Sequence, residues 1–119
     1  MFINISNHPS QRWCDDQRAA AEVFGEIVDL GFPNIDADEA TGQVSARAEA
    51  LCQEIVQHYV ANRDVVHVMG EMTFTYALVR RLQAQGFTCL ASTTSRIKQM
   101  LPDGTFLSEF RFKTFRDYE

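Results

Sequence analysis

The sequence predicts a three-layer, Rossmann-like α/β domain with a central parallel sheet and an antiparallel hairpin at one edge. Short apolar runs alternate with longer segments whose apolar residues recur every three or four positions, the pattern of strands alternating with helices. The chain has 119 residues, of which 45% are hydrophobic. This is enough for one core and too little for two, so we expect a single domain over residues 1–119.

The first half of the chain predicts two strands and two helices. The apolar run at residues 2–5 is the first strand, and residues 26–32 form the second. Between them, Ser10 is placed to cap a helix that stops at Gly25. Apolar residues at helical spacing over residues 44–59 predict the next helix.

The second half continues the alternation and then changes pattern. Residues 65–69 and 87–91 predict buried parallel strands, and apolar residues four apart over residues 74–82 predict the helix between them. Right-handed crossovers then give the strand order 2-1-3-4. Strands at residues 97–101 and 105–115 predict the hairpin, where Phe115 falls out of register and indicates a bulge or the end of the strand.

Charge is distributed unevenly along the chain. The net charge is −5, yet residues 1–71 hold four basic and twelve acidic side chains, whereas residues 72–116 hold seven basic and two acidic ones. The acidic total argues against non-specific binding to duplex nucleic acid, while the basic part favours one compact anion or a short oligonucleotide. A solvated basic face is the alternative explanation.

The sequence lacks several motifs that are typical of particular classes of protein, and each absence excludes one class of function. No apolar run approaches the roughly 20 residues of a membrane helix, and no signal peptide is evident, so we expect a cytoplasmic protein without a membrane partner. Cys14, Cys52 and Cys89 are too far apart in sequence for a CxxC site and read as reduced packing residues. Without GxGxxG, GxxxxGK[ST] or clustered metal ligands, we expect no cofactor and no metal.

Polar residues follow three of the predicted strands, where ligands gather in open α/β sheets. Ser6, Asn7, His8 and Ser10 follow the first strand. An accessible imidazole at His8 can act as a general acid or base, and the alternative is a loop histidine that caps nearby backbone. His67 lies within an apolar strand and is expected to be structural.

The second set is Gly70, Glu71, Met72 and Thr73. Gly70 lets the backbone approach a ligand, and the helix that begins near Thr73 offers free amides to a phosphate. Glu71 either caps this helix or orients a ribose, and capping is the favoured role.

The third set is a predicted turn with the sequence Ser92-Thr93-Thr94-Ser95-Arg96. Its hydroxyl groups and its guanidinium match the geometry of a phosphodiester. A Ser/Thr-rich turn without a ligand is the alternative.

These sets coincide with a family resemblance. The segments 69–74, 91–96, 103–104 and 112–118 together resemble the small stand-alone CRISPR-associated ring nucleases, and Ser6-Asn7-His8-Pro9 with Trp13 resembles the S-x-H-P pattern of a sister group. The resemblance implies a CARF-related domain that works as a two-fold homodimer. It also implies that the protein binds cyclic oligoadenylate, typically cyclic tetra-adenylate, and cleaves it to silence type III CRISPR signalling.

The implied chemistry needs no metal, because a ribose 2′-hydroxyl attacks its own 3′-phosphodiester and leaves a 2′,3′-cyclic phosphate. The catalytic residues it implies are His8, Arg96 and Ser10. The ligand-binding residues it implies are Ser6, Asn7, Gly70, Glu71, Met72, Thr73, Thr93, Thr94, Ser95, Arg111 and Arg116. A non-catalytic cyclic-nucleotide sensor and a general interaction module of the same fold are the alternative functions.

Overall fold

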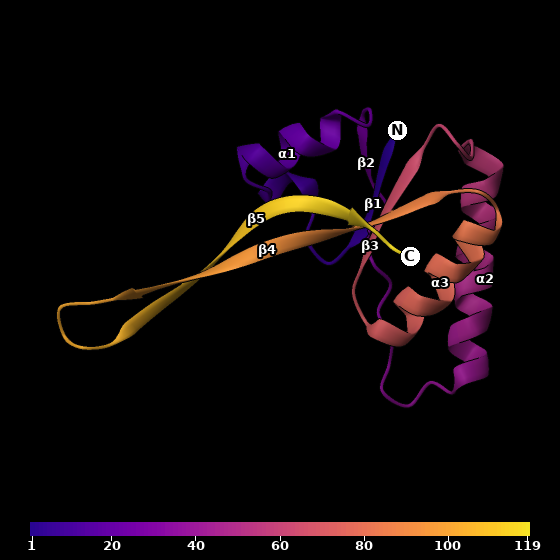
Figure 1. The fold of residues 1–119 in the computed structure, drawn as a ribbon. Coiled ribbons are helices and arrows are strands. Elements are labelled where there is room, and N and C mark those ends of the chain that lie inside the picture. Colours follow the sequence, from indigo (N-terminus) through magenta and orange to yellow (C-terminus); the bar gives the residue numbers. More distant parts are fainter.

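The structure, a computed structural model that describes residues 1–119, is a mixed five-stranded sheet with helices on both faces (Figure 1). Its elements are β1 (Phe2–Ser6), the 3-10 helix η1 (Ser10–Arg12), α1 (Asp15–Glu22), β2 (Ile27–Asp29), α2 (Thr41–His58), β3 (Val65–Met69), α3 (Met72–Ala84), β4 (Thr88–Met100) and β5 (Phe106–Asp117). The sheet order is β2-β1-β3-β4-β5, with β5 alone antiparallel to its neighbour. The predicted α/β class is confirmed. No helix combines the length and the apolar composition that crossing a bilayer requires.

The larger core lies between the sheet and the helices α2 and α3. Successive side chains of a strand point to opposite faces, so Ile3 and Ile5 of β1 share one face with Val66 and Val68 of β3. All four are fully buried in this core. The helices contribute Val44, Ala48, Cys52, Ile55, Phe74, Ala77, Leu78, Val79 and Leu82. The intervening strand residues therefore point to the opposite face, toward α1.

On that opposite face, α1 covers a small aromatic cluster. Phe2, Trp13 and Leu90 are buried there, and Phe115 of β5 packs against them. The Trp13 ring meets Phe2 edge-on at 5.9 Å between centroids, and the centroids of Phe115 and Phe2 are 4.9 Å apart. This cluster joins β5 to the body of the protein.

The first helix begins later than the sequence predicts. Ser10 starts the 3-10 turn η1, and α1 begins only at Asp15, with Cys14 as its N-cap residue. The predicted capping role of Ser10 is therefore wrong. Its side chain is buried and bonds to Asp29 of β2 instead, which takes it away from the helix terminus.

Strand β4 is the largest departure from the prediction. The sequence predicts a strand at residues 87–91 followed by a turn at residues 92–96, whereas the structure has one continuous strand, Thr88–Met100. The strand continues because β5 pairs with it over nearly its whole length and satisfies its backbone groups. A register shift midway along this pairing confirms the bulge predicted from Phe115.

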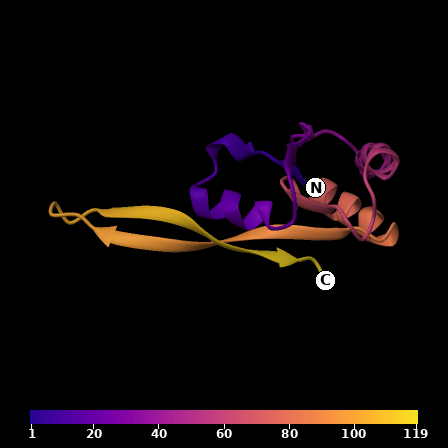
Figure 2. The same ribbon diagram turned by 90° about the horizontal axis from the view of Figure 1, so that it is seen from above.

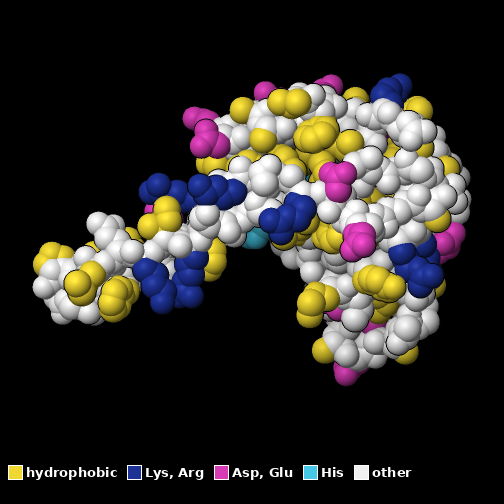
Figure 3. Space-filling view, in the orientation of Figure 1, with side chains coloured by type: hydrophobic (Ala, Val, Ile, Leu, Met, Phe, Trp, Pro, Cys, Tyr) yellow, Lys and Arg dark blue, Asp and Glu magenta, His cyan; other side chains and the backbone are white.

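The distal parts of β4 and β5 extend past the other three strands and project from the body as a two-stranded arm (Figures 1 and 2). Met100, Phe106, Leu107 and Phe110 near its tip are between 53% and 68% exposed. Residues 92–116 also carry five basic side chains and only two acidic ones, and Figure 3 shows the basic side chains gathered along the arm. Much of the basic part of the sequence thus forms this arm.

Gly70 is confined by the ring of Phe32. A Cβ atom at position 70 would overlap that ring, which itself packs edge-on against Phe74 at 5.3 Å between centroids. The missing side chain at position 70 therefore makes room for the Phe32 ring.

The substitution Gly70→Ala is expected to lower the free energy of unfolding by about 1–3 kcal/mol, because the added methyl group must displace the Phe32 ring. In a Phe32→Leu background, the same substitution is expected to cost clearly less. Urea unfolding of the four proteins measures both costs. Equal costs in the two backgrounds would contradict this steric explanation.

Candidate functional site

A cavity of about 850 Å³ opens at the carboxyl ends of β1 and β3, where the arm leaves the body. This volume is in the range of small-molecule sites. The lining residues are Ser6, Asn7, His8, Arg12, Trp13, Cys14, Asp16, Gln17, His67, Met69, Gly70, Ser92, Thr94, Glu109, Phe110, Arg111 and Phe112. We call this space the arm cavity.

The arm cavity brings together part of the residue set that the sequence predicts. The predicted residues on its wall are Ser6, Asn7, His8, Gly70, Thr94 and Arg111. The predicted residues that do not line it are Ser10, Glu71, Met72, Thr73, Thr93, Ser95, Arg96 and Arg116.

The continuous strand β4 explains why most of the third predicted set is absent from this wall. Side chains alternate along a strand, so Thr93 and Ser95 point away from the face that carries Thr94. Arg96 shares that face but lies farther out along the arm, where its guanidinium donates to Ser108 Oγ at 3.3 Å. A turn would have brought these groups together, and a strand spreads them over its two faces and its length.

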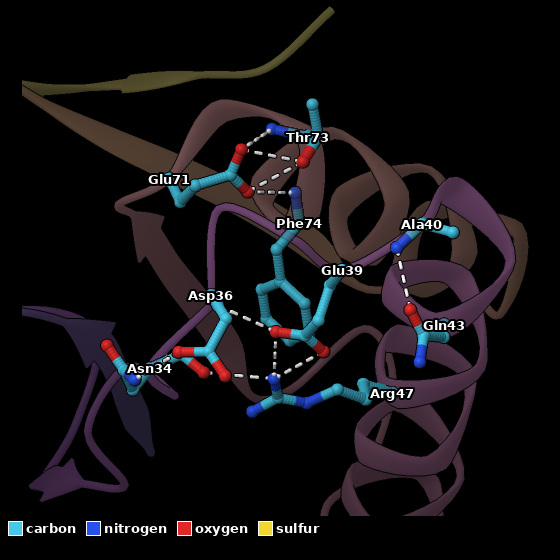
Figure 4. A network of polar contacts seen from close by, with 9 residues as sticks. All are labelled: Asn34, Asp36, Glu39, Ala40, Gln43, Arg47, Glu71, Thr73 and Phe74. Atoms are coloured by element: carbon cyan, nitrogen blue, oxygen red, sulfur yellow. Dashed lines mark hydrogen bonds and ion pairs between the residues drawn. The ribbon is translucent and has the colours of Figure 1, made fainter.

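Glu71 caps helix α3 (Figure 4). Its carboxylate accepts hydrogen bonds from the Thr73 hydroxyl at 2.6 Å and from the backbone N–H groups of Thr73 and Phe74 at 3.0 and 2.8 Å. These bonds lower the pKa of Glu71 below its usual value. The predicted capping role is confirmed. The carboxylate thus occupies the amides of Thr73 and Phe74, which are therefore not free for a phosphate.

A second cavity of about 520 Å³ lies between α2 and α3. Met72, Thr73 and Arg80 line it together with Glu39. Glu39 is paired with Arg47 at 2.8 Å in the network of Figure 4. Met72 and Thr73 therefore line this second cavity and not the arm cavity.

The loop that carries His8 is anchored through its backbone. The His8 carbonyl accepts hydrogen bonds from Asn4 Nδ2 at 3.1 Å, Ser6 Oγ at 3.1 Å and Trp13 Nε1 at 3.0 Å. The imidazole makes no hydrogen bond within the chain, so the alternative in which it caps backbone is not observed. His8 therefore offers a free imidazole to the arm cavity from a fixed loop.

Ser10 lies behind this loop. It is 5% exposed, and its hydroxyl and backbone N–H donate to the Asp29 carboxylate at 2.6 and 3.1 Å. Burial raises the pKa of Asp29, but the hydrogen bonds from Ser10 and Asn4 outweigh it and hold the pKa below its usual value. Ser10 thus fastens the loop to β2.

A row of polar side chains, buried only at its centre, crosses the sheet beneath the arm cavity. Asp29, Asn4 and His67 are in register on the neighbouring strands β2, β1 and β3. Asn4 Nδ2 donates to Asp29 Oδ1 at 2.7 Å, and His67 Nδ1 lies 2.9 Å from Asn4 Oδ1. On the other side of the ring, His67 Nε2 lies 3.3 Å from Ser92 Oγ. Asn4 is 1% exposed and His67 is 2% exposed. We call these four residues the polar row.

The polar row determines where the proton of His67 sits. An ionised carboxylate only accepts hydrogen bonds, so the group of Asn4 that faces Asp29 is its NH₂ and the group that faces His67 is its carbonyl. His67 must then donate from Nδ1. In the neutral ring, the Nε2 lone pair is consequently directed at Ser92.

Aromatic rings keep His67 neutral. Phe2 stacks on the imidazole at 5.7 Å between centroids, and Trp13 and Phe115 meet it edge-on at 5.7 and 5.4 Å. This burial, and secondarily the charge of nearby His8, lowers the pKa of His67 to about 4. At neutral pH the ring is therefore an uncharged hydrogen-bond acceptor at Nε2.

Ser92 directs two donors at a weak acceptor. Its hydroxyl lies 2.9 Å from Met69 Sδ, and its backbone N–H lies 3.1 Å from the same sulfur atom. A thioether is a poor hydrogen-bond acceptor, and Met69 is a flexible, 36% exposed side chain. A ligand oxygen that displaced this sulfur would receive the hydrogen bond of the Ser92 backbone N–H and would lie beside the Ser92 hydroxyl.

Sequence reasoning did not single out Arg12, and it did not predict that His67 would lie beside Ser92 on the cavity wall. One available signal was the pair of polar residues, Asn4 and His67, at the centres of two apolar strands that were predicted to be neighbours. Buried polar groups need partners, so such a pair predicts a hydrogen bond across the sheet.

The structure is thus an α/β domain with a cavity lined largely by polar side chains at the carboxyl edge of its sheet. Residues 1–116 match the uncharacterized MJ1673 protein family, and the chain belongs to this family. Neither a curated protein nor a solved structure is significantly similar to the chain.

Burial of neutral His67 is expected to make folding stability depend on pH. The ordinary pKa of 6.5 applies to the unfolded chain and a pKa of about 4 to the folded one. The unfolded state therefore binds a proton first, so stability is lost as pH falls from 6.5 toward 4, by about 3 kcal/mol in total. Urea unfolding across this range measures the loss.

In the variant His67→Gln, the free energy of unfolding is expected to depend less on pH between pH 6.5 and pH 4. The exposed helical His58 provides the control, since His58→Gln should leave the wild-type slope unchanged. Parallel curves for wild type and His67→Gln would contradict the assignment.

Proposed function

We propose that this protein is a ring nuclease, which binds cyclic oligoadenylate, in the first instance cyclic tetra-adenylate, and opens the ring without a metal. The observation that carries this proposal is the arm cavity, where a free imidazole, two guanidinium groups and several hydroxyls face one space. The resemblance of the sequence motifs to ring nucleases supports the same function. Opening the ring would end type III CRISPR signalling in the cytoplasm.

The proposed reaction makes three demands on the protein. A 2′-hydroxyl must lie in line with the phosphorus atom, protons must move, and charge on the phosphoryl oxygens must be stabilised. His8 is the proton-transfer group, because its imidazole is accessible and its loop is anchored. Arg12 and Arg111 stabilise the phosphoryl oxygens, so Arg111 takes the place that the sequence analysis gave to Arg96.

The remaining wall suits a nucleotide. Ser6, Asn7 and Thr94 supply short polar groups for ribose hydroxyls, and Phe110 and Phe112 supply aromatic faces on which adenine stacks. Arg96 and Arg116 contribute to the positive field of the arm rather than to direct contact.

The proposed active form is a homodimer. A ring of identical nucleotides presents equal faces to two copies related by a two-fold axis. The exposed apolar residues Met100, Phe106, Leu107 and Phe110 of the arm give a second copy a surface to cover.

Purified protein is expected to convert labelled cyclic tetra-adenylate into linear products that carry a 2′,3′-cyclic phosphate, with EDTA present throughout. The variant His8→Ala is expected to lower kcat by about 10²- to 10⁴-fold, as removal of a general acid or base does. Chromatographic separation of the products measures both. Bound but unchanged ligand would identify a sensor instead, and no binding would identify an interaction module.

The variant Arg111→Ala is expected to weaken binding of the ring by about 10-fold or more, because a hydrogen bond between charged groups is lost. Arg96→Ala should have a smaller effect. Arg80, on the wall of the second cavity, provides the matched control, and Arg80→Ala should bind as the wild type does. Titration calorimetry measures the affinities. A larger loss for Arg96→Ala than for Arg111→Ala would contradict the placement of the phosphate.

A further inference from the structure

We propose that Ser92 and His67 together are the general base of the arm cavity. The attacking 2′-hydroxyl gives its proton to Ser92 Oγ, and Ser92 gives its own proton to His67 Nε2. This inference rests on the proposed function, because it assigns the proton acceptor for that reaction. His8 then remains as the acid that protonates the leaving oxygen.

The geometry of the polar row carries this assignment. Ser92 Oγ, on the cavity wall, lies 3.3 Å from His67 Nε2, and His67 Nδ1 is held at 2.9 Å by Asn4. A hydroxyl, an imidazole and a group that orients the imidazole form the standard arrangement for activating a hydroxyl in an enzyme. A distance of 3.3 Å before ligand binding is within the range that tightens in a complex.

The far end of the polar row orients His67 so that Nε2 is the nitrogen available to accept a proton. Asn4 fixes the tautomer that leaves the Nε2 lone pair free for Ser92. Behind Asn4, the Asp29 carboxylate is kept ionised by its hydrogen bonds and accepts from Asn4 Nδ2, which keeps the Asn4 carbonyl turned toward His67. Asn4 and Asp29 are thus positioning residues for His67.

Ser92 also offers the place where the substrate would bind. Its hydroxyl and its backbone N–H both point at the Met69 sulfur, which satisfies them weakly. When the 2′-oxygen replaces that sulfur, the Ser92 hydroxyl rotates to donate to Nε2 and accepts the proton of the 2′-hydroxyl. A purely structural serine at this position would need no access to the cavity.

The step is balanced in atoms and charge. The bond between O2′ and phosphorus forms, and the bond between phosphorus and O5′ breaks. The proton of O2′ ends on His67 through Ser92, and the leaving O5′ takes a proton from His8. The products are a 2′,3′-cyclic phosphate and a 5′-hydroxyl, and the two histidines return to their starting states by proton exchange with water.

The pH profile separates the two histidines. Burial by Phe2, Trp13 and Phe115 lowers the pKa of His67 to about 4, and the ionisable groups on the cavity wall are His8, Arg12, Cys14, Asp16, Glu109 and Arg111. With His67 as the base, kcat/KM should stay high as pH falls through 6.5 and decline only toward pH 4. A decline in kcat/KM that is already complete by pH 5.5 would contradict His67 as the base.

The test compares variants in the cleavage assay. Ser92→Ala and His67→Gln are expected to lower kcat by about 10²- to 10⁴-fold with little change in KM, and Ser92→Thr should retain more activity than Ser92→Ala because it keeps a hydroxyl. Ser45→Ala, a serine on α2 outside the arm cavity, is the control. Urea unfolding of each variant establishes that it is folded, and the Ser92 pair of variants decides the matter if His67→Gln unfolds.

Nitrogen NMR of the ligand-free wild type gives a readout that does not depend on cleavage. His67 is expected to carry its proton on Nδ1 and to stay neutral from pH 7 to pH 5.5. A proton on Nε2, or titration near pH 6.5, would overturn the inference. The inference would also be overturned if the wild type cleaves the ring and the kcat of Ser92→Ala is within a few-fold of the wild-type kcat. A folded wild type that cleaves no cyclic oligoadenylate overturns the proposed function and this inference with it.

Discussion

The hydrogen bonds of one buried amide, that of Asn4, set the geometry of the candidate site. The amide joins the carboxylate of Asp29 to the imidazole of His67, and it also holds the carbonyl of His8 and the hydroxyl of Ser6. Because an amide has one donating and one accepting end, a carboxylate on one side forces a donor on the other. The tautomer of His67 and the position of the His8 loop follow from that constraint.

The arm is the second constraint on the site. Because β5 pairs with β4, β4 continues as a strand past the edge of the body. Phe115 attaches this pair of strands to the aromatic cluster around Phe2. The bulge in their pairing puts Phe112 and Phe115 on the same face, with ring centroids 4.9 Å apart. The base of the arm consequently forms one wall of the cavity, and the loop after β1 forms the wall across from it.

Two imidazoles with different surroundings serve the same cavity. His8 is exposed on an anchored loop, whereas His67 is enclosed by aromatic rings, which push its pKa down to about 4. Proteins assign different proton-transfer roles to two like groups in one site by giving them different surroundings. The proposed division of labour between His8 and His67 therefore follows from their burial and needs no further ionisable group.

The sequence by itself determined the α/β class, the alternation of elements, the bulge near Phe115 and the capping role of Glu71, because each depends on local periodicity or on groups a few residues apart. Tertiary structure decided the rest. Residues 92–96 form a strand because β5, whose paired residues lie farther along the chain, satisfies their backbone. Gly70 faces Phe32, and Asn4 reaches His67 from 63 positions away. Such contacts depend on which strands become neighbours in the sheet. The spacing of residues along the chain does not reveal which residues of neighbouring strands will meet.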